Sequence, residues 1–197
     1  MKRLRLGFIL LLLLTIPLQV RAGVPLDTVE GHVNNVLKVL RDPALQGDAN
    51  KENKQEKIET IADEMFDYVA LSRLTLGRNW KKFDSSQKKE FVQLYRSILE
   101  KAYMEKILSY TDEKVTFDKE TMLSDKKAEV QTHIITKSTE IPIFYRVYLK
   151  DGKWKVYDVI IEGISLIKNY RTQFRDILAN NPPEEVLKIL REKTEQA

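Results

Sequence analysis

The sequence predicts an α+β domain in which helices pack on one antiparallel sheet of about four strands. Three observations predict this fold class. Apolar residues recur at helical spacing through the first half of the chain, alternate with a period of two through much of the second half, and return to helical spacing after Ser165. The chain has no internal repeat and no low-complexity tract, so one domain is expected.

The first 22 residues are typical of a cleaved signal peptide. Three basic residues precede an uncharged apolar run at 6–16, and a small-residue cleavage site follows at Val20-Arg21-Ala22. The run is short for a membrane span, which needs about 20 residues. A retained anchor is the alternative. We favour a signal peptide at 1–22 and a single mature domain at 23–197, exported to an oxidising compartment such as a bacterial periplasm.

The leader carries the whole formal charge of the chain, +4, on Lys2, Arg3, Arg5 and Arg21. The remaining 29 of the 33 basic residues balance the 29 acidic residues, so the mature domain is formally neutral. A neutral protein lacks the positive field that drives nucleic-acid binding, and we exclude that class. With no cysteine, the chain forms no disulfide and cannot be acylated as a lipoprotein, so its stability must come from an apolar core.

Two capping boxes mark helix starts in the first half. Asp27 and Glu30 form one, before an apolar stripe that ends at Asp42-Pro43. Asp84 and Gln87 form the other, which opens a long helix.

Between these helices lies a second helical pattern, at 58–69, which continues towards Gly77, a suitable helix C-cap.

The strands are expected in the second half. Alternation predicts strands at 115–117 and 130–136, followed by a hairpin of 141–149 and 154–161. Asp151-Gly152 is a strong signal for the tight turn of this hairpin. A last helix is expected after Asn181-Pro182-Pro183.

No recognisable set of catalytic residues is present. Gly163-Ile164-Ser165 begins like a nucleophile elbow, but Ile167 replaces the second glycine of that motif. With two distant histidines and no cysteine, no zinc-ligand spacing exists. Asp158 and Glu162 share a predicted strand face with their backbones about 13 Å apart, too far for a carboxylate pair.

The predicted hairpin carries apolar and aromatic residues on both faces of its strands. A sheet covered by helices on one side needs only one apolar face. The surplus fits either a well-filled core or a cavity that closes around an apolar ligand, and the pattern alone leaves both open.

Two blocks carry a family resemblance. One is LTLGRNWK at 74–81 with QKKEF at 87–91; the other is WKVYDVIIEGIS at 154–165 with Asn169-Tyr170-Arg171 and Phe174. On these motifs the chain resembles the MlaC family of periplasmic phospholipid-binding proteins, also called toluene-tolerance auxiliary transport proteins. The resemblance covers essentially all of the mature domain, and the second block is the more specific.

The resemblance implies an NTF2-like fold with an apolar cavity between helices and sheet. It implies a carrier, not an enzyme, with no cofactor and with phospholipid as cargo. The implied partners are an outer-membrane lipoprotein complex and an inner-membrane ABC transporter with a lipid-binding ring component. Carried onto matching positions, it predicts that Tyr103 and Ile164 line the pocket. The apolar pattern adds these residues: Phe91, Ile98, Ile107, Tyr145, Val147, Val156 and Ile160.

Two basic clusters are candidates for docking on a membrane partner. The first consists of Arg73, Arg78, Lys81 and Lys82; the second consists of Arg146, Lys150, Lys153 and Lys155. Complementary charge speeds encounter, so we expect these clusters to meet acidic surfaces on the transporter. A merely solvated surface is the alternative.

Three other functions stay open. One is a secreted NTF2-like enzyme on a small apolar substrate, with Asp158 or Glu162 as acid/base, which a raised pKa in a closed pocket would favour. The others are a carrier of hopanoid or another envelope lipid, and a protein-binding module whose apolar faces meet partners.

Overall fold

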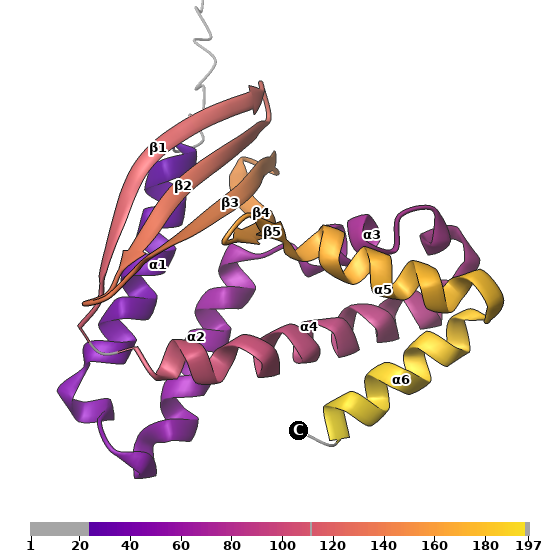
Figure 1. Cartoon of the computed structure of the whole chain (residues 1–197), viewed down its shortest axis with the longest axis horizontal. Helices are drawn as coiled ribbons and strands as arrows, with labels where there is room; N and C mark the ends of the chain where they lie inside the picture. Colours follow the sequence, from indigo (N-terminus) through magenta and orange to yellow (C-terminus); the bar gives the residue numbers. More distant parts are fainter. Residues whose placement is uncertain (1–23, 111, 196–197) are drawn as a thin grey trace, which may run out of the picture.

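The structure, a computed structural model, describes residues 24–110 and 112–195, so the predicted signal peptide at 1–22 lies outside the described residues (Figure 1). The helices are α1 (Pro25–Arg41), α2 (Lys51–Met65), α3 (Tyr68–Leu76), α4 (Ser85–Leu108), α5 (Leu166–Asn180) and α6 (Pro183–Glu195). The 3₁₀ segments are η1 (Pro43–Leu45), η2 (Asp48–Asn50) and η3 (Gly77–Lys82). The strands are β1 (Lys114–Ser124), β2 (Lys127–Ile135), β3 (Glu140–Lys150), β4 (Lys153–Ile161) and β5 (Ile164–Ser165).

The five strands form one antiparallel sheet in the order β1-β2-β3-β4-β5, which confirms the predicted α+β class. The sequence indicated about four strands, because β5 is only two residues long and too short to show alternation. The β3–β4 turn is the one predicted. Asp151 and Gly152 have φ values of 49° and 77°, and two successive positive φ angles are the signature of a tight hairpin turn.

The predicted capping box of α1 is wrong. The helix begins at Pro25, so Asp27 lies inside its first turn. A carboxylate distant in sequence takes the capping role instead: the Leu26 backbone N–H donates to Glu120 Oε2 on β1, at 2.8 Å. This contact ties the start of α1 to the sheet, on which the helix packs.

The helical pattern at 58–69 is interrupted. Helix α2 ends at Met65, and Phe66 turns extended and forms a parallel bridge with Val156 of β4. The Asp67 backbone N–H donates to the Val156 carbonyl, and the Asp67 side chain caps α3 by accepting from the Ala70 N–H at 2.9 Å. The break therefore fastens the helical half of the chain to the edge of the sheet.

The ends of α3 and α4 agree with the sequence. Gly77 is the C-cap of α3, with a φ of 55°. Asp84 and Gln87 form the predicted capping box of α4, each side chain accepting from the other residue's backbone N–H at 2.9 Å. Helix α4 is 24 residues long and runs below the sheet in Figure 1, with α5 drawn above it and α6 packed on it from below.

Aromatic rings join α4 to α5. The Phe91 ring lies 5.3 Å from the Phe174 ring and 5.5 Å from the Tyr95 ring, with tilted or edge-on geometry. Phe91 and Tyr95 have no exposed surface. Such buried aromatic pairs stabilise the contact between the two helices.

Phe91→Ala should therefore lower the free energy of unfolding by about 3–5 kcal/mol, because it leaves a cavity among closely packed rings. Urea denaturation followed by circular dichroism measures the change. Leu123→Ala is the control: this side chain is exposed, so a change within about 0.5 kcal/mol is expected. Equal effects of the two substitutions would contradict the assigned core.

Candidate functional site

A bulge in β4 decides which side chains face the helices. Strand pairing places Arg146 opposite Asp158 but the next residue, Val147, opposite Val156, so Tyr157 is the extra residue. Val156 and Val159 consequently lie on the same face, with Tyr145 and Val147 of β3. This helix-facing side holds the apolar interior.

The apolar interior consists of two clusters. The main cluster joins the sheet to α1, α3, α4, α5 and α6, and includes Val29, Leu71, Phe91, Tyr95, Val147 and Phe174. The second cluster comprises buried Leu40, Ile58 and Met104, with half-buried Val36, Leu37, Val39, Ile107, Leu108 and Tyr110. The two clusters are separate, although α4 contributes to both.

Several half-buried apolar side chains of α4 and the sheet pack against one or the other of these clusters. We call them the apolar band: Ile98, Tyr103 and Ile107 of α4, Phe117 of β1, Ile143 and Tyr145 of β3, and Ile161 of β4. Ile98 and Tyr103 pack against the main cluster and Ile107 against the second, over about 14 Å of helix. Apolar surface that is neither closed off nor fully solvated is what a ligand of matching chemistry can cover.

The ionisable groups at the band are phenols. Burial raises the pKa of Tyr145 to about 12, and the neighbouring Tyr110 hydroxyl adds to the shift. Burial likewise raises the pKa of Tyr110 to about 12, with Glu113 raising it further and Arg41 opposing. The Tyr110 hydroxyl is buried without a hydrogen-bond partner among the described residues. Both phenols are therefore neutral near pH 7, so the band carries no charge that would repel an acyl chain.

The structure divides the predicted lipid-binding residues. Ile98, Tyr103, Ile107 and Tyr145 lie in the apolar band. In contrast, Phe91, Val147 and Val156 are fully buried in the main cluster, where neighbouring side chains fill the space around them.

Ile160 and Ile164 lie elsewhere. The bulge at Tyr157 turns Ile160 to the side of the sheet away from Val156, where it pairs with Phe144. Ile164 lies on β5 at the sheet edge and is 61 % exposed.

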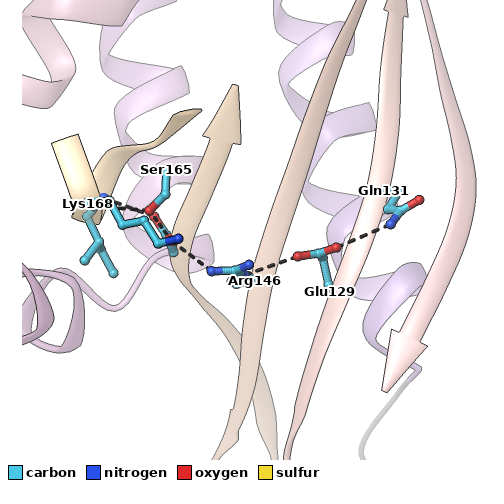
Figure 2. Close-up of polar contacts among 7 residues, drawn as sticks. Glu129, Gln131, Arg146, Ser165 and Lys168 are labelled. Atoms are coloured by element: carbon cyan, nitrogen blue, oxygen red, sulfur yellow. Dashed lines mark hydrogen bonds and ion pairs between the residues drawn. The ribbon is translucent and has the colours of Figure 1, made fainter. Parts of the chain in front are cut away.

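The outer face of the sheet, opposite the main cluster, carries a polar ladder across four strands (Figure 2). Gln131 and Arg146 both donate to Glu129, and Arg146 pairs at 3.7 Å with Asp158. Asp158 is 2 % exposed and accepts from the Ser165 hydroxyl at 2.7 Å and the Ile167 backbone N–H at 3.1 Å. Asp158 thereby fixes the passage from β5 into α5.

These contacts bear on the acid/base candidates. The acceptor oxygens of Asp158 are occupied by structural donors, whereas Glu162 is exposed in a turn at a φ of 49°. No group of acidic or histidine side chains within 24–110 and 112–195 could hold a metal ion.

The basic docking candidates do not form one surface. Arg73, Arg78 and Lys81 are exposed at the end of α3 and in η3. The Lys82 ammonium donates a hydrogen bond to the Leu178 backbone carbonyl, at 3.0 Å. Arg146 belongs to the ladder on the outer face and pairs with Glu129 and Asp158.

The sequence analysis did not include four half-buried residues among the candidates for the pocket wall. They are Tyr110, Phe117, Ile143 and Ile161. Phe117 and Ile143 carried a signal, since each alternates with its strand neighbours. Tyr110 also carried a signal, since it continues the helical spacing of Tyr103 and Ile107, although α4 ends at Leu108.

The role given to Asp158 predicts a loss of stability on substitution. Asp158→Asn should lower the free energy of unfolding by about 1–3 kcal/mol, because it removes the charge paired with Arg146 and an acceptor needed by two buried donors. The matched control is Glu162→Gln, expected within about 0.5 kcal/mol. Chemical denaturation of both variants is the test, and an unchanged midpoint for Asp158→Asn would refute the anchoring role.

Known proteins resemble this chain along most of its length. The toluene tolerance protein ttg2D of Pseudomonas putida is 26% identical over 180 residues, covering 90% of this chain and 84% of that protein. The MlaC binding protein of an intermembrane phospholipid transport system in Haemophilus influenzae is 25% identical over 117 residues, covering 55% of each protein. A phospholipid-binding protein from Ralstonia solanacearum, solved with a phospholipid, superposes with a TM-score of 0.78 at 22% identity, covering 88% of this chain and 98% of that one.

The family model of the MlaC protein matches residues 30–192, which include every helix and strand from α1 to α6 in whole or in part. The whole sheet, the second cluster and all buried residues of the main cluster except Val29 lie within this match. The chain belongs to the MlaC family.

Proposed function

We propose that this protein is a periplasmic phospholipid carrier that holds acyl chains along the apolar band. The observation that carries the proposal is the band itself, a set of half-buried apolar side chains of α4 and the sheet that pack against the two clusters. Its relatives support it, because two of them are named for binding or transporting phospholipid. The signal peptide predicted at 1–22 supports export.

The energetics suit a carrier with apolar walls. Two acyl chains contain roughly 30 methylenes, and each is worth about 0.8 kcal/mol when removed from water, or on the order of 24 kcal/mol together. A lipid leaves a bilayer only for a site whose free energy of acyl-chain burial is about the same as that of the bilayer. It leaves the site again only if burial there is not much more favourable. Walls of isoleucine, phenylalanine and tyrosine approximate this balance.

We further propose a route. The carrier takes phospholipid between an outer-membrane lipoprotein complex and an inner-membrane ABC transporter with a lipid-binding ring component. The proposed role is binding without catalysis, since the buried Asp158 carboxylate has a structural role in the sheet. Ile164 remains a predicted pocket residue, and its exposure at the sheet edge suits a position at the mouth better than one in the wall.

Tyr145→Glu should reduce co-purifying phospholipid at least about tenfold, because it places a charge among apolar chains. Organic extraction and mass spectrometry, normalised to protein, measure the load. Ile107→Gln is a milder second variant on α4, and a clear partial loss is expected.

Phe144→Glu is the matched control, since Phe144 is the neighbour of Tyr145 on β3 but lies on the outer face. It should keep the normal load. Wild-type protein that neither co-purifies with phospholipid nor takes it up from vesicles would sink the proposed function. A normal load in folded Tyr145→Glu and Ile107→Gln would remove the band from the site.

Docking is proposed to use Arg73, Arg78 and Lys81, the exposed members of the first basic cluster. The double substitution Arg73→Glu and Arg78→Glu should weaken association with the purified transporter complex about tenfold, chiefly through slower association. Surface plasmon resonance measures the rates, and the lipid load should stay normal. Lys188→Glu on α6 is the control of equal exposure, and indistinguishable rates for the double variant would exclude this cluster.

A further inference from the structure

A hollow lies away from the apolar band, where α1, α2 and the start of β4 meet. Seven residues line it: Thr28, His32, Glu64, Gly152, Lys153, Trp154 and Lys155. Its volume of about 400 Å³ falls in the range of small-molecule sites. None of these residues belongs to the band, so the hollow needs its own explanation.

Two buried nitrogens at this hollow have no hydrogen-bond partner among the described residues. One is Nε1 of Trp154, a side chain that is only 7 % exposed. The other is Nδ1 of His32. An indole N–H can only donate, and leaving it unpaired in the interior costs free energy. The Trp154 N–H therefore calls for a group that brings a hydrogen-bond acceptor, whereas Nδ1 of a neutral His32 donates or accepts according to its tautomer.

The charges at the hollow specify the acceptor further. Lys153 and Lys155 contribute two positive charges and Glu64 one negative charge. Burial lowers the pKa of His32, with Glu64 opposing and Lys155 adding to the effect, so the imidazole is mainly neutral at pH 7. The lining thus has a formal charge of +1, which a single negative charge neutralises.

We propose that this hollow binds a small oxyanion of charge −1, the chemistry shared by a carboxylate and a phosphodiester. The Trp154 N–H and the Lys153 ammonium donate to its oxygens. The Lys155 ammonium donates to the Glu64 backbone carbonyl. Lys155 thereby closes the edge of the hollow, and its side chain moves aside when the oxyanion enters. This site is separate from the acyl-chain site and does not depend on the proposed function.

Nuclear magnetic resonance tests the proposal directly, since the chain has two tryptophans and each gives one indole N–H signal. The ¹⁵N-labelled protein is titrated at constant ionic strength with acetate, with dimethyl phosphate and with neutral glycerol. We expect a saturable shift of the Trp154 indole signal with at least one oxyanion and none with glycerol. The Trp80 signal is the internal control and should stay in place. The oxyanion that binds more tightly tells a carboxylate ligand from a lipid-type phosphodiester.

Lys153→Gln should weaken this binding about tenfold, since it removes a charged donor. Lys126→Gln is the matched control, because Lys126 lies in the β1–β2 turn, is equally exposed and does not line the hollow. Unchanged affinity in Lys153→Gln, an equal loss in Lys126→Gln, a Trp154 signal that never moves, or equal shifts of both indoles would each overturn the proposal.

Discussion

The bulge at Tyr157 is the constraint on which the rest of the structure depends. One extra residue in β4 brings Val156 and Val159 to the helix-facing side and turns Asp158 and Ile160 outward. The inward pair completes the apolar wall. The outward Asp158 holds the start of α5, which carries Phe174 into the aromatic cluster with Phe91. A single irregularity therefore supports both the apolar wall and the helix that closes the fold.

The division of the apolar interior follows from this arrangement. The main cluster is packed to completion between the sheet and α3 to α6, and the second cluster ties the lower part of α1 to α2 and α4. Helix α4 bridges them, and its middle is left half covered. The close packing inside each of the two clusters stabilises the fold. The boundary between the clusters is not needed for this stability. That boundary is then available for a ligand whose apolar surface completes the burial.

Sequence alone predicted the features that local chemistry dictates. The Asp84–Gln87 capping box and the Asp151-Gly152 turn each depend on residues next to one another in the chain. It missed features that depend on distant partners, such as Glu120 capping α1 and the bulge that reverses Ile160. For the same reason the pattern found apolar residues on the strands but could not separate packed residues from half-buried ones, since that requires the facing helix.

The central claim is that acyl chains lie along the apolar band, between the two clusters. Photolabelling tests it most directly: the protein is loaded with a phospholipid that carries a diazirine near the end of one acyl chain, irradiated, digested and sequenced by mass spectrometry. We predict adducts confined to α4 between Ile98 and Ile107 and to the helix-facing residues of β3, Ile143 and Tyr145. Adducts concentrated on the outer face, at Phe144 and Ile160, or spread evenly over the surface would contradict the account.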